Sequence, residues 1–170
     1  GKSGYLPACI VAIAAQKTGK PCKLVYDRDD DMRITGKRHD FISAYKVGFD
    51  VNGVINALRI QHDMRCGMSM DLSAAIAERA LMHSENSYYI PNVEFIANLY
   101  KTNTPSNTAF RGFGGPQGML AMERVIDEIA HFLKLDPLTI RKRNFYLDNK
   151  NSMQKEQQTP YGQFIKDCII

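Results

Sequence analysis

Residues 41–65 read FISAYKVGFDVNGVINALRIQHDMR, and this stretch decides the fold. Two β-rich segments, Phe41 to Asp50 and Val54 to Arg65, flank Val51-Asn52-Gly53. Asn-Gly between two such segments is the strongest short-range signal of a β-hairpin, because the tightest hairpin turns need residues that tolerate a positive φ. The sequence therefore predicts an antiparallel hairpin here.

Further along the chain, the apolar pattern predicts two helices. The longer begins at Pro116 and ends near Leu135, because its apolar residues recur at steps of three and four and so form one stripe. The stripe consists of Met119, Met122, Ile126, Ile129 and Leu133. Asp136 is placed to cap a second, shorter helix that starts at Pro137 and runs to Asn144.

Four more elements are expected before the longer helix. An Ala- and Ile-rich segment from Pro7 to Lys17 predicts a helix, as does the Ala-rich segment from Asp71 to His83, with Asp71 or Ser73 as its N-cap. Apolar and polar residues alternate from Cys22 to Tyr26 and predict a short strand. The segment from Asn92 to Lys101 predicts another strand.

Helices and a hairpin without regular βαβ alternation predict the α+β class, with the helices packed on a mostly antiparallel sheet. The polar run 102–108 should be a loop, and the polar residues 147–160 should form a flexible segment. The chain opens with Gly1-Lys2-Ser3-Gly4 and has no initiator Met. We therefore expect residues 1–170 to be a piece of a larger domain.

Composition argues against several classes of protein. With 170 residues, 44% of them apolar and 24% charged, the chain has the usage of an ordinary globular domain rather than of a disordered or fibrous protein. No stretch approaches the roughly 18 consecutive apolar residues of a membrane span, so we expect no membrane partner. The net charge of +4 comes from scattered Lys and Arg residues, which argues against nucleic-acid binding.

The residue types that hold metals show no metal-site spacing. The cysteines are far apart and are expected to be buried or free thiols in a reducing cytosol; they are Cys9, Cys22, Cys66 and Cys168. The histidines lack the His-Glu-x-x-His pattern and are expected to be structural or exposed; they are His39, His62, His83 and His131. Asp27 to Asp31 lack the glycine and distal Glu of a calcium loop and suggest a solvated turn.

The most unusual segment is Phe110-Arg111-Gly112-Phe113-Gly114-Gly115-Pro116-Gln117-Gly118. Its glycines let the backbone approach a bulky ligand, the helix that follows offers unpaired N–H groups to an anion, and Arg111 adds a forked cation. These features favour a site for a phosphate-bearing or oxyanion ligand. The alternative is a tight turn into the helix, with Arg111 in solvent and Phe113 in the core. The pattern matches neither a Walker A loop nor a dinucleotide-binding fingerprint.

Arg79 lies in an otherwise apolar helical segment, Ala77-Glu78-Arg79-Ala80-Leu81. It could project into a pocket, or it could pair with Glu78 or remain a surface cation. The residues alone leave these alternatives open.

Several motifs are spread over the chain. The most specific are Thr102-Asn103, Ser106-Asn107-Thr108-Ala109 and the segment from Phe110 to Gly118. Others are Lys17-Thr18-Gly19, Asp27-Arg28-Asp29-Asp30-Asp31-Met32, Ile34-Thr35-Gly36-Lys37-Arg38-His39, Tyr45-Lys46-Val47-Gly48, Glu78-Arg79-Ala80-Leu81 with His83, and Ile90-Pro91-Asn92. Together these motifs resemble the molybdopterin-binding region of xanthine dehydrogenases, which are molybdenum hydroxylases. Tyr161-Gly162-Gln163 resembles the bacterial, large-subunit form.

The resemblance implies a role for each residue that matches a family motif. Arg79 would be the catalytic residue that binds the purine and stabilises the negative charge developing on it. Phe113 would pack against the substrate ring. The residues that would bind the cofactor, with Arg111 next to the metal, are Phe110, Arg111, Gly112, Gly114, Gly115 and Gln117.

The resemblance also implies an activity and its partners. Purines such as hypoxanthine and xanthine would be oxidised to urate with water as the oxygen source, using a molybdenum-molybdopterin cofactor and a glutamate base. The base, two 2Fe–2S clusters and FAD lie in other regions or subunits of the family. We therefore expect this chain to be inactive alone, and to act in the cytoplasm with the remainder of the molybdopterin domain and an iron–sulfur/FAD subunit.

One departure from the family pattern concerns the substrate. Xanthine-specific members carry Phe-Gly-Gly-Lys-Glu at the amino end, where the glutamate contacts the purine. If Lys2 is the family lysine, Ser3 replaces this glutamate, whereas counting back from Lys17-Thr18-Gly19 puts the position at Gly1. Ser3 in this position would favour an aldehyde or another N-heterocycle as substrate. A non-catalytic module that binds a phosphate ligand is a further alternative.

Overall fold

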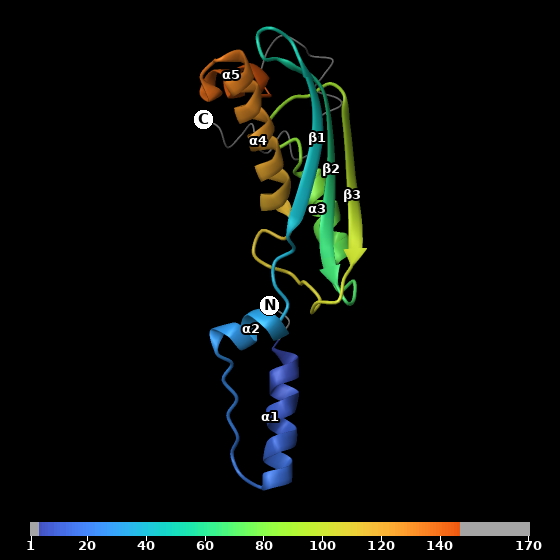
Figure 1. Ribbon diagram of the computed structural model, residues 1–170, viewed down its shortest axis with the longest axis vertical. Helices are drawn as coiled ribbons and strands as arrows, with labels where there is room; N and C mark the ends of the chain where they lie inside the picture. The colour runs from blue at the N-terminus through green and yellow to red at the C-terminus, as the bar shows by residue number, and fades with distance from the viewer. Residues whose placement is uncertain (1–3, 147–170) are drawn as a thin grey trace.

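The computed structural model describes residues 4–146 and has the α+β fold that the sequence predicts (Figure 1). The strands are β1 (Phe41–Phe49), β2 (Ile55–Gly67) and β3 (Val93–Lys101). The helices are α1 (Tyr5–Thr18), α2 (Arg28–Ile34), α3 (Ser73–Met82), α4 (Gly115–Leu133) and α5 (Pro137–Asn144). The flexible segment expected at 147–160 lies outside the described residues.

The predicted hairpin is present. β1 pairs antiparallel with β2 along its whole length. In the turn, Gly53 has a φ of +80°, which a residue without a Cβ adopts at little cost. The Asp50 carboxylate accepts the backbone N–H groups of Asn52 and Val54, at 2.8 and 2.9 Å. The turn is thus held by the Asp side chain as well as by its Asn-Gly pair.

The third strand makes the sheet mixed rather than mostly antiparallel, which corrects one detail of the prediction. β3 pairs parallel with β2, and the strand order is β1-β2-β3. A parallel pair needs a long crossover connection, which residues 68–92 with α3 supply. The strand itself is where the sequence places it, but its direction depends on tertiary packing.

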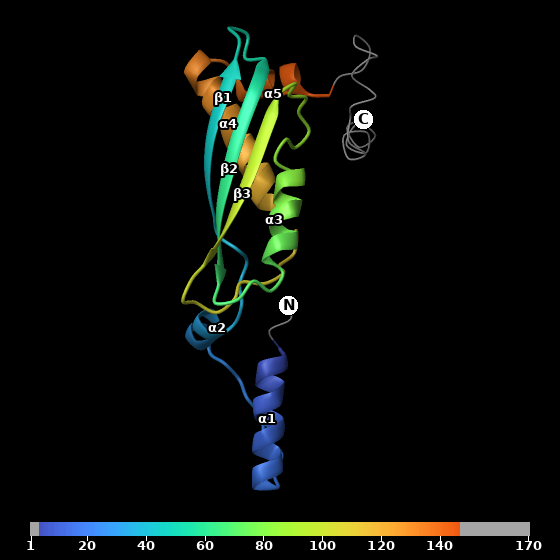
Figure 2. The ribbon, with the colours of Figure 1, turned by 90° about the vertical axis from the view of Figure 1, so that its right-hand side faces the viewer.

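The core lies between the sheet and α4, which crosses one face of it (Figure 2). In the predicted stripe, Met122 and Ile126 are fully buried and Ile129 is 1% exposed. Met119 is 37% exposed instead, because Gly118 forms the buried contact of this turn of the helix. The predicted stripe is therefore confirmed from its second residue onward.

α5 begins where the sequence predicts and is fixed to α4 by a charged cluster. The Asp136 carboxylate caps the helix by accepting the backbone N–H of Thr139 at 2.9 Å. From the same helix, the Arg141 guanidinium lies 2.7 Å from Glu123 and 2.8 Å from Asp127, both on α4. One arginine thus bridges two carboxylates of the neighbouring helix.

α3 has the predicted position but not the predicted cap. Leu72 occupies the N-cap position and no side chain caps the helix, so the prediction of Asp71 or Ser73 is wrong. Both side chains are used in tertiary contacts. The Ser73 hydroxyl lies 2.7 Å from His39 Nε2, and the Asp71 carboxylate accepts the Thr108 hydroxyl at 2.7 Å.

The N-terminal segment, residues 4–35, lies apart from the sheet (Figures 1 and 2). α1 confirms the predicted helix, and none of its residues is buried. The strand expected at 22–26 is absent, because no strand within residues 4–146 pairs with this segment. α2 replaces the expected turn of charged residues: Asp27 caps it by accepting the Asp30 N–H at 2.8 Å. No helix in the described part of the chain is long and apolar enough to cross a membrane.

Candidate functional site

Residues 110–115, which we call the glycine loop, form a tight turn that leads into α4. The Phe113 N–H donates to the Phe110 carbonyl at 2.8 Å, and the Gly115 N–H donates to the Gly112 carbonyl at 3.0 Å. The backbone φ is +98° at Gly112 and Gly114 and +50° at Phe113. Because Phe113 carries a side chain in the left-handed region, surrounding contacts must stabilise this conformation.

The glycines at the start of α4 allow a close approach to α3. A Cβ on Gly114 would lie 2.1 Å from the carbonyl oxygen of Ile76, and a Cβ on Gly118 would lie 2.3 Å from the carbonyl oxygen of Ala80. Both distances are far below van der Waals contact, so any larger residue would push the helices apart. α3 carries Arg79, and the glycines therefore bring its helix against the glycine loop.

Arg79 and Phe113 lie on these two neighbouring elements but in different surroundings. Phe113 is partly buried and packs against a small cluster that includes Met64, Ile76 and Ala77. Arg79 is exposed, and its guanidinium forms no hydrogen bond or ion pair within residues 4–146. Phe113 therefore lies partly in the core, which is the alternative that the sequence left open. That Arg79 and Phe113 contact the same ligand stays a prediction.

A second segment, residues 36–39, runs beside the glycine loop, and we call it the strap. The Thr108 N–H donates to the Lys37 carbonyl at 3.0 Å, just before the loop begins. Just after the loop, Gln117 Nε2 donates to the His39 carbonyl at 3.1 Å. Gln117, predicted to bind the cofactor, therefore already uses its amide nitrogen to join α4 to the strap.

Three buried side-chain atoms beside the glycine loop have no hydrogen-bond partner among the described residues. They are Arg38 Nη1, His39 Nδ1 and Gln117 Oε1. Buried polar atoms are nearly always paired in folded proteins. An unpaired guanidinium donor, an unpaired imidazole nitrogen and an unpaired amide acceptor next to the loop therefore suit a polar group that the described residues do not supply.

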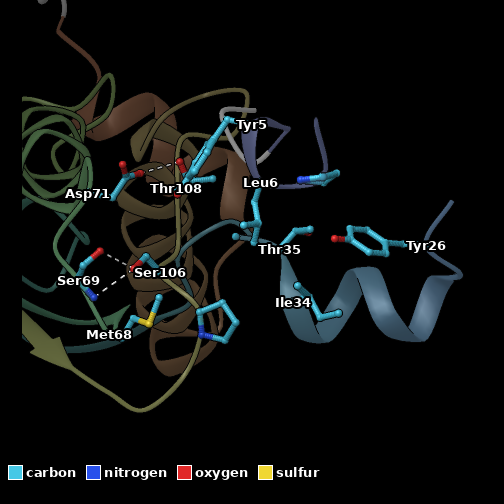
Figure 3. A pocket seen from close by; sticks show the side chains of 13 residues that line it. Tyr5, Leu6, Tyr26, Ile34, Thr35, Met68, Ser69, Asp71, Ser106 and Thr108 are labelled. Atoms are coloured by element: carbon cyan, nitrogen blue, oxygen red, sulfur yellow. Dashed lines mark hydrogen bonds between the residues drawn. The ribbon is translucent and has the colours of Figure 1, made fainter. Parts of the chain in front are cut away.

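A cavity of about 200 Å³ lies between the strap, the N-terminal segment and the residues before the glycine loop (Figure 3). Its labelled lining residues are Tyr5, Leu6, Tyr26, Ile34, Thr35, Met68, Ser69, Asp71, Ser106 and Thr108. On one side, the Ser69 and Ser106 hydroxyl oxygens are 2.6 Å apart, and the Thr108 hydroxyl donates to Asp71. An apolar wall with a few hydroxyl and carboxylate groups is typical of small-molecule sites.

The sequence reasoning assigned no binding role to this cavity or to the strap. Ser106, Thr108 and Arg38 lie inside motifs that carried the family resemblance, but nothing in their spacing indicated what they contact. Asp71 was singled out only as a helix cap. Its φ of +42°, unusual for a residue with a side chain, has no signature in the sequence.

Two histidines have the structural roles that the sequence predicts. His62 is fully buried, and its two ring nitrogens lie 2.8 Å from the Ser43 hydroxyl and 2.9 Å from the Ser84 hydroxyl. Burial lowers the pKa of His62, and likewise that of His39, below the usual value. Burial therefore favours the neutral form of both rings.

Within residues 4–146 no group of three His, Cys, Asp or Glu side chains could hold a metal ion. The cysteines in that range, Cys9, Cys22 and Cys66, are free thiols as expected, and Cys168 lies outside it. The acids of Asp27 to Asp31 belong to the first turns of α2 and its cap. The described part of the chain therefore offers a polar cradle at the glycine loop rather than a set of metal ligands.

Residues 1–145 match the family described as the molybdopterin cofactor-binding domain. The chain is 45% identical to the xanthine dehydrogenase of Drosophila subobscura over 168 residues, which is 98% of this chain and 12% of that protein. It is 52% identical to the xanthine dehydrogenase/oxidase of Mus musculus over 136 residues, which is 80% of this chain and 10% of that protein. The chain thus spans about a tenth of the length of these curated relatives.

Among solved structures, the fold is similar to that of the aldehyde oxidoreductase from Desulfovibrio gigas. The TM-score is 0.72 with 30% sequence identity, over 84% of this chain and 16% of that one. The chain is therefore similar to this protein in the arrangement of its helices and strands as well as in sequence.

Proposed function

The chain belongs to the molybdopterin cofactor-binding domain family, and from this premise we propose that it supplies part of the cofactor and substrate sites of a molybdenum hydroxylase that oxidises purines. The observation that carries the proposal is the close packing of the glycine loop on the helix of Arg79, in a chain 45% to 52% identical to xanthine dehydrogenases. This packing supports a shared site for Arg79 and Phe113, because it makes their two elements neighbours.

The residues around the glycine loop fit a polar cofactor such as molybdopterin. The unpaired Arg38 Nη1 supplies a buried donor and the unpaired Gln117 Oε1 a buried acceptor, as a phosphate-bearing pterin requires. When bound, the molybdenum cofactor would supply the redox chemistry that adds oxygen from water to the substrate. The residues that would hold it are Phe110, Arg111, Gly112, Gly114, Gly115 and Gln117, with Arg111 next to the metal.

Arg79 and Phe113 would act on the substrate. The Arg79 guanidinium has no ion-pair partner within the described residues, so it is available to a ligand anion. Fixed beside a purine, it would stabilise the negative charge that develops on the ring as the bond to oxygen forms. Phe113 would orient the ring by packing against it, with its own position fixed by the cluster behind it.

The test compares Arg79→Met with Arg33→Met in the protein expressed from its complete gene. Arg33 is an exposed arginine on α2, so it controls for the loss of one surface charge. We expect Arg79→Met to lower kcat/KM for xanthine about 100-fold or more, as for removal of one transition-state donor, and Arg33→Met to leave it unchanged. Equal rates for wild type and Arg79→Met would contradict the role of Arg79.

An aldehyde or another N-heterocycle is the second candidate substrate. The similarity to an aldehyde oxidoreductase structure at 30% identity favours it, as would Ser3 in the position of the family glutamate. The same purified protein should be assayed with xanthine and with an aromatic aldehyde at matched concentrations. Faster turnover of the aldehyde would replace the purine with this class of substrate.

The remaining partners belong to the same proposal. Two 2Fe–2S clusters and FAD on other domains or subunits would carry electrons away from the site, and the enzyme would act in the cytoplasm. Because the chain covers about a tenth of its relatives, residues 1–170 with added cofactor should reduce no dye in the presence of xanthine. Turnover above a blank would contradict this expectation. It would favour a complete catalytic site within this chain.

A further inference from the structure

A single guanidinium joins the strap to the glycine loop. Arg38 Nη2 donates to the Arg111 carbonyl at 2.6 Å, across 73 positions of sequence. The same guanidinium lies over the Phe110 ring, with its Cζ 4.3 Å from the ring centroid. One side chain therefore contacts both the backbone and an aromatic side chain in the first two residues of the loop.

These two contacts hold the more exposed half of the loop. The second half rests on α3 through Gly114, and Phe113 packs into the small cluster. Phe110, in contrast, is 57% exposed, and Arg111 is also exposed. Arg38 thus contacts both residues at the exposed start of the loop.

The loop conformation needs such a contact because it is unfavourable in isolation. Positive φ at Phe113 costs free energy that neighbouring contacts must offset. The Phe113 N–H donates to the carbonyl of Phe110, so movement of Phe110 would weaken the hydrogen bond that closes this turn. Arg38 stabilises the residue on which the strained turn depends.

The chemistry of this contact requires arginine. A planar guanidinium can stack on a ring and donate in its own plane to a carbonyl at the same time, whereas a lysine ammonium is a point charge without a stacking plane. Arg38 Nη1 lies 3.7 Å from the position of a Cβ on Gly112, so the guanidinium also occupies the space beside that glycine.

We propose that Arg38 is a positioning residue that fixes the conformation of the glycine loop, and through it the placement of Arg111 and Phe113. The effect on loop order depends only on contacts within this chain. Its consequence for the cofactor rests on the proposed function. The two can therefore be measured separately.

The test is hydrogen–deuterium exchange in the protein expressed from its complete gene, with Arg38→Gln, Arg38→Lys and the control Arg33→Gln. Arg38→Gln should raise the exchange rate of the amides of Phe113 and Gly115 about tenfold, as expected for loss of a hydrogen bond to a charged group. Arg38→Lys should restore little of this protection. Exchange in β2 should stay at the wild-type level in every variant, and Arg33→Gln should leave the loop unchanged.

A milder variant covers the case in which Arg38→Gln does not fold. Phe110→Leu removes the ring and leaves the guanidinium and its hydrogen bond in place, and it should raise exchange at the same two amides about threefold. Wild-type exchange at Phe113 and Gly115 in the folded variants would overturn the proposal.

Cofactor content separates this proposal from the proposed function. The molybdenum and pterin retained after dialysis should fall in Arg38→Gln and not in Arg33→Gln. Faster loop exchange with unchanged cofactor content would leave Arg38 as the positioning residue and contradict a cofactor site at the glycine loop. Unchanged exchange would overturn the role of Arg38 whatever the cofactor content.

Discussion

α1 and α4 both carry many apolar residues, yet of these two helices only α4 packs against the core in the described part of the chain. Eight of the 19 residues of α4 are buried, and none of the 14 residues of α1 is. In α4 most of the apolar residues form one stripe that packs into the core, whereas in α1 Ile10 is 45% exposed and Ile13 is 55% exposed. Pattern, and not apolar content, decides which helix folds against this sheet.

The sharpest test of this comparison is the same substitution in both helices. Ile126→Ala in α4 removes a fully buried side chain and should lower the free energy of unfolding by about 2–5 kcal/mol. Ile13→Ala in α1 should change it by less than about 0.5 kcal/mol, because that side chain is half exposed. Urea unfolding followed by far-UV circular dichroism measures both. A large effect of Ile13→Ala would show that α1 belongs to the same cooperative unit as the sheet.

A second pair of substitutions, at two glycines with positive φ, separates the cost of steric crowding from the cost of backbone strain. Gly114 and Gly19 both have positive φ, +98° and +61°, but a Cβ would lie 2.1 Å from a carbonyl oxygen only at Gly114, and nothing lies within 4 Å at Gly19. Gly114→Ala should therefore cost about 2–4 kcal/mol of unfolding free energy, from strain and overpacking together. Gly19→Ala should cost only about 1 kcal/mol, from strain. Similar costs at both positions would mean that α3 moves freely to accept the methyl group.

The pH dependence of stability should come from the sheet region, because residues 4–35 contain no histidine. Burial lowers the pKa of His62 in the folded state below its unfolded value of about 6.5. The unfolded chain then binds more protons between the two pKa values, so the stabilisation is complete above about pH 6.5 and is lost as pH falls through the folded pKa. Urea unfolding at pH 7 and pH 5 should show this loss, and His62→Gln should reduce it. If His62→Gln loses as much unfolding free energy between pH 7 and pH 5 as the wild type, the pH dependence comes from other groups, of which His39 is the first candidate.

The elements that the sequence predicts correctly are those in which one local rule is sufficient. The hairpin follows from Asn52-Gly53, and α4 follows from its stripe. The sequence does not predict α2, because a helix of seven residues has too few apolar positions to show a period. The strand expected from Cys22 to Tyr26 is wrong for the opposite reason: its residues alternate, but no strand in the described part of the chain lies beside it.

The candidate site shows the same division. The glycine loop is evident in the sequence as a run of glycines, but the structure explains Gly114 and Gly118 by close packing on α3. Arg38 could not be identified as a contact of the loop, because 73 residues separate it from Arg111 and only the fold joins them. The roles of Arg79 and Phe113 come from the family resemblance and stay predictions, because the structure shows only that their helix and loop are neighbours.

The smallest expected effect on the free energy of unfolding comes from substitutions at exposed apolar residues of α1. Tyr5 is 73% exposed and Ile13 is 55% exposed, so α1 presents apolar surface to solvent. Single domains rarely leave large apolar patches exposed, and residues 1–170 alone should therefore self-associate. The double variant Ile10→Glu with Ile13→Glu should abolish this association and change the free energy of unfolding by less than about 0.5 kcal/mol, because neither side chain contributes to the core. Sedimentation velocity over a wide concentration range measures the first effect and urea unfolding the second. A wild-type chain that is monomeric throughout would contradict the association. A variant that associates like the wild type would move the contact from α1 to another surface, such as the exposed edge of β1.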